Sequence, residues 1–178
     1  MSGICQSRVV IITGAGGGLG AAHAKEFANE GASVVVNDIN QQAAAAVVEE
    51  IVASGGKAVA NHSDITNYDD AQNAVTQAIE VFGGLDIVVN NAGINRDRMF
   101  ASLSEAEWDA IMAVHLKGHF CISSHAVQYW RAQFKAGNPV SARIINTTSG
   151  AGLQGSVGQS NYAAAKAGIA ALTLNQAA

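Results

Sequence analysis

Short apolar runs rich in Val and Ile alternate along this chain with longer stretches rich in Ala. The short runs are nearly continuous in apolar residues, which is typical of parallel strands buried on both faces. The stretches between them are long enough for helices. We predict strands at Val9–Thr13, Ser33–Asn37, Ala58–Asn61, Leu85–Asn90 and Arg143–Thr147, and helices at Leu19–Asn29, Gln41–Ala53, Asp69–Phe82, Glu105–Phe134 and from Ser160 onward.

The alternation of strand and helix predicts the fold class. Strands that alternate strictly with helices form a parallel sheet with right-handed crossovers, so we expect an α/β fold with a doubly wound sheet and helices on both faces. Ser104 opens the fourth predicted helix with a capping-box pattern, because Glu107 stands three residues later. The length of 178 residues indicates one domain, residues 1–178. Ligands of such sheets bind beyond the carboxyl ends of the strands.

A glycine-rich turn follows the first predicted strand. Positions 13–20 read TGAGGGLG, and a helix is expected directly afterwards. Glycines allow a sharp turn and let main-chain N–H groups approach a pyrophosphate, while the helix N-terminus adds a partial positive charge. The alternative is a glycine turn without a ligand, which the strand before and the helix after make the weaker hypothesis. We therefore expect Gly14, Gly18, Leu19 and Gly20 to bind a dinucleotide.

Asp38 follows the second predicted strand and stands 18 residues after Gly20. An acidic residue at about this separation accepts hydrogen bonds from the ribose hydroxyls of a bound dinucleotide. Its charge would repel a 2′-phosphate, and neither the glycine turn nor the residues beside Asp38 supply a Lys or Arg. We predict NAD as the cofactor. The alternative is an aspartate that only stabilises a turn.

Three polar residues near the end of the chain predict proton-transfer chemistry. Tyr162 and Lys166 are four residues apart, which places both on one face of a helix. An ammonium beside a phenol favours the phenolate form. Ser149 stands 13 residues before the tyrosine, just past the fifth predicted strand, where its hydroxyl can hold a carbonyl or alcohol oxygen. A Tyr–Lys pair alone arises by chance on helix surfaces, but the serine and the glycine turn make chance a poor explanation.

Composition narrows the classes of partner. The chain has 10 Lys and Arg against 14 Asp and Glu, a net charge of −4, and shows no basic cluster. This argues against binding to nucleic acid or to an anionic membrane. Cys5 and Cys121 have neither metal-ligand nor disulfide spacing, so we expect no metal and a cytoplasmic location. The first apolar run, residues 9–12, is too short for a signal peptide or a membrane span.

Taken together, these motifs resemble those of the short-chain dehydrogenase/reductase family, and the resemblance covers essentially the whole chain. Residues 13–20 fit the cofactor motif of the family, and residues 90–93 fit its N-N-A-G motif. Asp64 and Ile65 fit the pair that contacts adenine after the third strand. The catalytic Ser, Tyr and Lys of the family match Ser149, Tyr162 and Lys166.

The resemblance implies a Rossmann-type fold, a nicotinamide cofactor and a role for each matching residue. Tyr162 would be the proton donor or acceptor, and Lys166 would hold the nicotinamide ribose and favour the ionised tyrosine. Ser149 would orient the substrate. Asn91 would line the cofactor site.

Two features depart from the family pattern. The family usually has an Asn in the fourth helix that completes a catalytic tetrad through a water relay, and His115 stands in that place here. A histidine can bind such a water and would add pH sensitivity near neutrality, or it can simply pack in the core. The family runs to about 250 residues, so we expect the sixth and seventh strands to be missing from this chain. The other histidines are expected only to pack or to lie on the surface.

The resemblance also suggests a substrate class. Residues 94–100 and 114–118 are similar to those of family members that act on 3-oxoacyl or 3-hydroxyacyl thioesters. We expect an NAD-dependent 3-hydroxyacyl-CoA dehydrogenase that acts on a small-molecule acyl thioester and forms a homo-oligomer, a dimer or a tetramer. Two alternatives stay open. One is an NADPH-dependent 3-oxoacyl-acyl carrier protein reductase, and the other is a truncated nucleotide-binding module without turnover.

Overall fold

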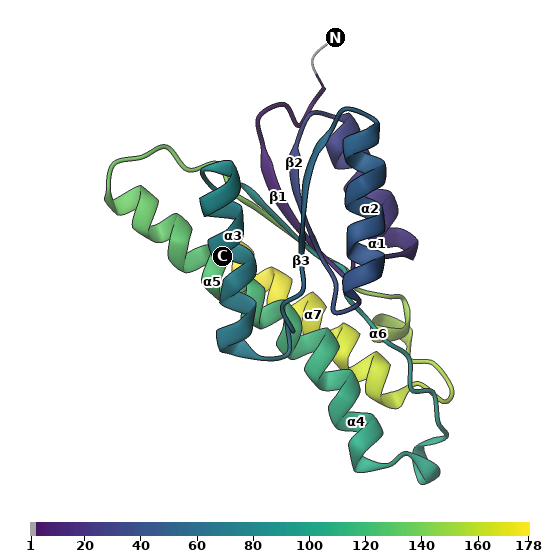
Figure 1. The fold of residues 1–178 in the computed structure, drawn as a ribbon. Helices are drawn as coiled ribbons and strands as arrows, with labels where there is room; N and C mark the ends of the chain where they lie inside the picture. Colours follow the sequence, from purple (N-terminus) through teal and green to yellow (C-terminus); the bar gives the residue numbers. More distant parts are fainter. Residues whose placement is uncertain (1–2) are drawn as a thin grey trace.

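Five parallel strands form one sheet in the order β3-β2-β1-β4-β5 (Figure 1). The computed structural model describes residues 3–178. The strands are β1 (Val9–Thr13), β2 (Ser33–Asn37), β3 (Lys57–Asn61), β4 (Ile87–Asn90) and β5 (Arg143–Asn146). Each predicted strand is present within two residues of its expected bounds. The order reverses between β1 and β4, which is where a doubly wound sheet opens a crevice for a ligand.

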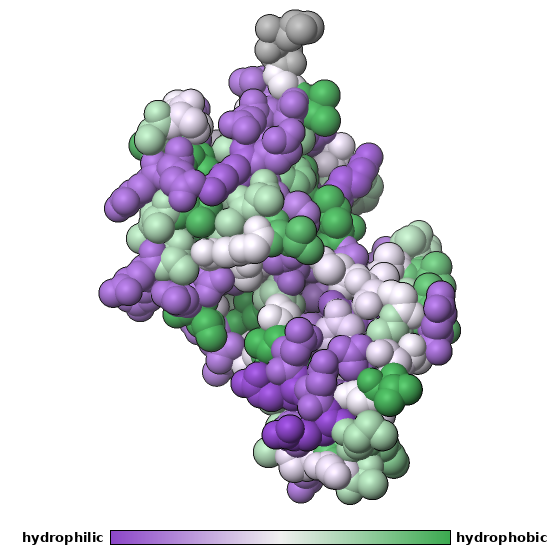
Figure 2. Space-filling view, turned by 90° about the vertical axis from the view of Figure 1, so that its right-hand side faces the viewer, coloured by the Kyte–Doolittle hydropathy of each residue, from purple (hydrophilic) through white to green (hydrophobic). Residues whose placement is uncertain are grey.

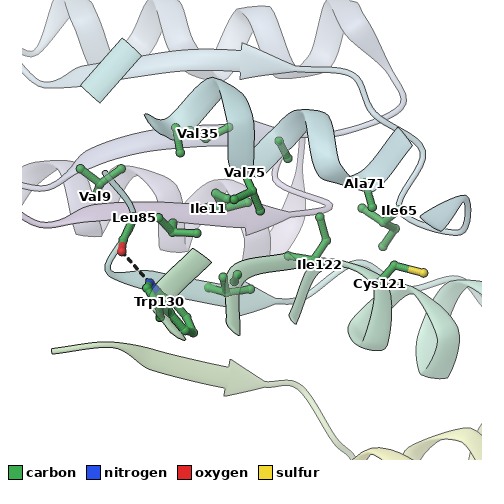
Figure 3. Close-up of a cluster of buried hydrophobic side chains, with 14 residues drawn as sticks. Val9, Ile11, Val35, Ile65, Ala71, Val75, Leu85, Cys121, Ile122 and Trp130 are labelled. Atoms are coloured by element: carbon green, nitrogen blue, oxygen red, sulfur yellow. Dashed lines mark hydrogen bonds between the residues drawn. The ribbon is translucent and has the colours of Figure 1, made fainter. Parts of the chain in front are cut away.

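Helices cover both faces of the sheet, as expected. On one face α1 (Gly18–Asn29) and α2 (Gln41–Ala53) bury the side chains of the first hydrophobic cluster. On the other face α3 (Tyr68–Phe82) and α5 (Gly118–Lys135) enclose a second cluster, in which the indole N–H of Trp130 donates to the Leu85 carbonyl at 2.7 Å (Figure 3). The last helix, α7 (Ser160–Ala177), packs against the short helix α6 (Ala151–Gln154). Helices α6 and α7 follow β5, and the 3-10 turn η1 (Phe100–Ser102) follows β4. All three therefore come after the carboxyl end of a strand.

The predicted single helix Glu105–Phe134 is wrong in one respect, because it is interrupted. The structure has α4 (Glu105–Ile111), then a π-helical segment η2 (Met112–Lys117), then α5. The expected start is confirmed, since the Ser104 side chain accepts from the Glu107 N–H and the Glu107 carboxylate accepts from the Ser104 N–H. A π-turn inserts a residue into the helical ladder and re-aims the side chains that follow it.

Burial distinguishes the three central strands from the two edge strands. Strands β1 and β4 are buried throughout, and β2 nearly so. The expectation that every strand is buried on both faces is wrong for β3 and β5, which are partly exposed. In β5 the Ile145 side chain is 46% exposed. The reason is position, because each edge strand has a neighbour on one side only.

Within residues 3–178, no helix is both long and apolar enough to cross a bilayer. The face drawn in Figure 2 intersperses hydrophilic and hydrophobic side chains.

Candidate active site

The glycine turn makes an open cradle at the carboxyl end of β1. Gly14 has φ +61°, and a Cβ there would lie 2.7 Å from the Ala92 Cα, so the turn needs glycine for both conformation and space. No side chain caps α1 at Gly17, and the positions where Gly17 and Gly18 would carry a Cβ are open. The free N–H groups at the start of α1 therefore fit a pyrophosphate. Leu19 lies in the first turn of α1 and is 70% exposed.

Asn91 and Thr13 fasten this turn to the end of β4. The Thr13 hydroxyl oxygen accepts from the main-chain N–H groups of Asn91 and Ala92, both at 3.0 Å. In return, the Asn91 amide donates to the carbonyls of Thr13 and Gly14, at 3.0 and 3.2 Å. Asn91 thus holds the two loops that form the cradle in register. It lies beside the predicted cofactor site rather than pointing freely into it.

Asp38 lies at the rim of the crevice, and each of its carboxylate oxygens accepts a hydrogen bond from a main-chain N–H group. Oδ2 accepts from the Gly16 N–H and Oδ1 accepts from the Asn40 N–H, both at 2.9 Å. Next to it is a cavity of about 220 Å3 whose lining includes Gly14, Asp38, Asp64 and Ile65. The structure therefore brings four predicted cofactor residues to one hollow. Its size and its mixed lining suit the adenosine end of a dinucleotide.

Lys166 is buried on α7 with its ammonium beside the Tyr162 ring. It is 2% exposed, its Nζ lies 5.5 Å from the ring centroid, and Nζ donates to the Thr147 carbonyl at 2.6 Å. No carboxylate forms a salt bridge with it among the described residues. Burial lowers the pKa of Lys166 to about 8. Ser149 lies just past β5, where its hydroxyl oxygen accepts from the Ala151 N–H at 3.2 Å.

His115 occupies the middle of η2 and faces Tyr162. The two rings meet edge to face with centroids 5.1 Å apart. His115 Nε2 lies 2.7 Å from the Ile94 carbonyl oxygen and 3.1 Å from the Ile94 nitrogen, and the shorter contact makes Nε2–H a donor. Burial lowers the pKa of His115. The expected titration near neutrality is therefore displaced to lower pH, and the imidazole is neutral at neutral pH.

His119 packs in the core, which is one of the two outcomes expected for the remaining histidines. It is fully buried one turn after His115, close enough to Lys166 for the ammonium to act on it. The spacing of four residues between the two histidines places both on one face of a helix.

Comparison with known proteins identifies the family. A family model described as short chain dehydrogenase matches residues 8–178. The chain is 52% identical over 177 residues to hydroxyacyl-CoA dehydrogenase ChsB1 of Mycobacterium tuberculosis, and 44% identical over 174 residues to peroxisomal multifunctional enzyme type 2 of Mus musculus. A crystal structure of a short chain dehydrogenase from Mycobacterium avium superposes with a TM-score of 0.95 at 60% identity.

The coverage of these matches is unequal. The match to ChsB1 covers 96% of this chain and 56% of the relative, and the match to the Mus musculus enzyme covers 93% of this chain and 22% of the relative. The match to the Mycobacterium avium structure covers 97% of this chain and 63% of that chain. The similarity therefore extends over nearly all of the residues given, and the relatives have further residues beyond the matched part. The chain belongs to the short-chain dehydrogenase family.

Proposed function

We propose that this chain carries the cofactor site and the catalytic residues of an NAD-dependent dehydrogenase that interconverts 3-hydroxyacyl-CoA and 3-oxoacyl-CoA. The observation that carries the proposal is the placement of a buried ammonium, that of Lys166, against the ring of Tyr162. Tyr162 contacts His115, which packs on the loop after β4 that the glycine cradle also contacts. A protein that only binds a nucleotide has no chemical need for a buried, unpaired lysine, because burying a charge opposes folding.

Asp38 supports NAD over NADP. Its carboxylate is fixed at the rim of the adenosine cavity by two main-chain N–H groups, so it cannot easily move away from a ribose. A carboxylate in this place accepts from ribose hydroxyls and repels a 2′-phosphate. In this proposal Gly14, Gly18 and the start of α1 hold the pyrophosphate. When bound, the nicotinamide supplies the hydride acceptor or donor.

In this proposal Tyr162 transfers the proton of the reacting hydroxyl, and Lys166 and Ser149 assist it. In the oxidative direction the Tyr162 phenolate takes the proton of the substrate hydroxyl, and Lys166 stabilises that phenolate. The Ser149 hydroxyl donates to the substrate oxygen and so orients it. His115 fixes the Ile94 main chain, which is part of the lining of the cavity beside Asp38, and its ring meets the Tyr162 ring edge to face.

The substrate class rests on the relatives. The 52% identical relative is named a hydroxyacyl-CoA dehydrogenase, and several other relatives are named multifunctional or hydratase-dehydrogenase-epimerase enzymes of peroxisomes. The loop that follows β4 also exposes apolar side chains, with Met99 62% and Phe100 74% exposed, and the preceding residue of this loop, Arg98, donates its main-chain N–H to the Gly158 carbonyl just before α7. An acyl chain is apolar, so these side chains suit its binding.

A homo-oligomer and a cytoplasmic location are further parts of the proposal. Exposed apolar side chains recur every seven residues along α5, at Phe120, Val127 and Phe134. This spacing places them along one face of the helix, where a second helix could cover them. The cytoplasmic location rests only on the two cysteines, whose spacing is not that of a disulfide framework.

Steady-state kinetics test the proposed function. The full-length protein that contains these residues is assayed for NAD+ reduction with 3-hydroxyacyl-CoA substrates of increasing chain length, and for NADPH oxidation with 3-oxoacyl-acyl carrier protein. We expect turnover in the first assay and its loss in Tyr162→Phe, a variant that keeps the ring. Turnover in the second assay alone would favour the reductase, and turnover in neither would favour a nucleotide-binding module.

A further inference from the structure

Asn161, the residue before the proposed proton-transfer tyrosine, is a buried polar side chain that the proposed reaction leaves unused. It is the second residue of α7 and is 0% exposed. An amide that is buried away from water opposes folding unless its polar atoms find partners. The partners of Asn161 therefore show which segments of the chain it holds.

The Asn161 amide connects three segments that are far apart in the sequence. Its Nδ2 donates to the Arg96 carbonyl at 3.2 Å, in the loop that follows β4, and to the Glu107 carbonyl at 3.3 Å, in α4. Its Oδ1 accepts from the Tyr162 main-chain N–H at 2.8 Å. Both amide hydrogens and the amide oxygen are thus used. One buried side chain therefore joins the loop after β4, the first turn of α4 and the first turn of α7.

The start of α7 depends on this amide because no side chain caps the helix. Gln159 occupies the N-cap position, and its side chain makes no capping bond there. The first N–H groups of a helix have no partner inside the helix. Asn161 Oδ1 gives one of them an acceptor, and that N–H belongs to Tyr162. The main chain of the tyrosine is thus held by the same amide that holds the loop.

Two further bonds join this loop to the residues before α7. The Arg98 N–H donates to the Gly158 carbonyl at 2.8 Å, and Gln159 Nε2 donates to an Asp97 carboxylate oxygen at 3.0 Å. The side-chain bond is exposed, so water competes for both of its partners. The Asn161 amide is fully buried, and its removal leaves two carbonyls and one N–H without their partner. The cost of losing a bond is therefore greater at Asn161 than at Gln159.

We infer that Asn161 is a positioning residue, which couples the loop after β4 to the start of α7 and so sets the place of Tyr162 relative to bound substrate. The apolar side chains proposed to contact the acyl chain, Met99 and Phe100, follow closely after the Arg96 carbonyl that the amide holds. Tyr162 is the next residue on the other side of the amide. The catalytic consequence rests on the proposed function, whereas the coupling of the two segments does not.

Kinetics of the full-length protein test the positioning role. In Asn161→Ala the loop and the Tyr162 main chain lose their common restraint, so we expect kcat with a 3-hydroxyacyl-CoA to fall at least about tenfold. The dissociation constant for NADH should stay within about twofold, because the cavity beside Asp38 is lined by other residues. Expressing kcat per NADH-binding site excludes unfolded molecules. A merely structural role would lower stability and leave this kcat unchanged.

Two further variants make the test sharper. Gln159→Ala removes the exposed side-chain bond between the same two segments and should keep kcat within about twofold of wild type. Asn161→Ser keeps an oxygen that can accept from the Tyr162 N–H, but its side chain is too short to reach both carbonyls. It leaves a smaller defect than alanine and replaces that variant if Asn161→Ala does not fold. We expect its kcat also to lie below that of wild type.

Hydrogen exchange followed by mass spectrometry tests the coupling without turnover. In the Asn161 variants, peptides that cover residues 94–99 should exchange on the order of tenfold faster, because the loop opens more often. Peptides from β1 should exchange as in wild type. Unchanged exchange in residues 94–99 would overturn the coupling.

The outcomes separate this inference from the proposed function. A wild-type kcat in Asn161→Ala or, if that variant does not fold, in Asn161→Ser would overturn the positioning role. Faster exchange in a protein without dehydrogenase turnover would contradict the proposed function and leave the coupling standing. Normal turnover in wild type, with a loop whose exchange does not depend on Asn161, would overturn the inference alone.

Discussion

Asp38 illustrates what a single residue reveals at the sequence level and what it does not. Its charge and its place after a buried strand predict a ribose contact and the exclusion of a 2′-phosphate. The bonds from the Gly16 and Asn40 N–H groups, which immobilise the carboxylate, could not be predicted, because they depend on how two turns meet in space.

Lys166 shows the cost of placing a charge in the core. Among residues 3–178 no carboxylate pairs with its buried ammonium. Burial lowers the pKa of Lys166 to about 8 from an ordinary value of 10.5. Below pH 8 the lysine is charged in both the folded and the unfolded chain, so the full penalty opposes folding. Between pH 8 and 10.5 the folded form is neutral while the unfolded form still binds the proton, so stability rises with pH.

Replacement of Lys166 by Met should therefore stabilise the cofactor-free protein. We expect a gain in the free energy of unfolding on the order of 2 kcal/mol at pH 7, which shrinks as the pH rises from 8 to 10.5. Urea unfolding of Lys166→Met and wild type across this range measures the difference, in which other titrating groups cancel. A gain that is absent at pH 7, or that grows with pH, would contradict the buried ammonium.

At the scale of elements, the π-helical segment η2 sets the geometry of the site. It lies between α4 and α5 and carries His115, which reaches across to the Ile94 main chain. Gly93 packs so closely on the imidazole that a Cβ there would lie 2.6 Å from its Cε1. The segment thus braces the loop that follows β4, which forms one wall of the cavity beside Asp38.

Substitutions at His115 test this bracing. In His115→Leu the Ile94 carbonyl loses its donor, so the loop should loosen and the affinity for NADH should fall on the order of tenfold, about 1.4 kcal/mol. His115→Asn, which keeps an amide donor, should stay closer to wild type. Isothermal titration with NADH gives both values. An unchanged affinity in the Leu variant would show that the contact with Ile94 is dispensable.

The same elements show how far sequence reasoning reaches. The strands and the start of α4 follow from local signals, namely continuous apolar runs and a capping box, so they could be predicted. The π-turn could not, because no residue type encodes it and tertiary packing decides where a helix takes an extra residue. The exposure of β5 could not be predicted from its apolar residues either, since it depends on which strand lies next to it.

At the scale of the whole molecule, β5 leaves one edge of the sheet open. Ile145 is half-exposed on this strand, and a groove beside it is lined by Val127, Trp130, Ile144 and Thr173. An open edge with apolar side chains is a template for pairing with another chain.

Produced as residues 1–178 alone, the chain should therefore associate. We expect oligomers or aggregates at tens of μM, and we expect Ile145→Lys, which places a charge on the open edge, to reduce them. Sedimentation velocity of both proteins measures this. A monodisperse wild-type chain, with a sedimentation coefficient that the substitution leaves unchanged, would show that the open edge of β5 does not promote association.

The preference for NAD over NADP depends on residues that all lie within this chain, and a fluorescence titration of the full-length protein with NADH and NADPH measures it. Nicotinamide fluorescence gives a dissociation constant for each cofactor, in wild type and in Asp38→Ser. We predict that wild type binds NADH at least about tenfold more tightly, ~1.4 kcal/mol, and that the variant narrows the difference by admitting the 2′-phosphate. Tighter binding of NADPH by the wild-type protein would show that Asp38 does not exclude the 2′-phosphate.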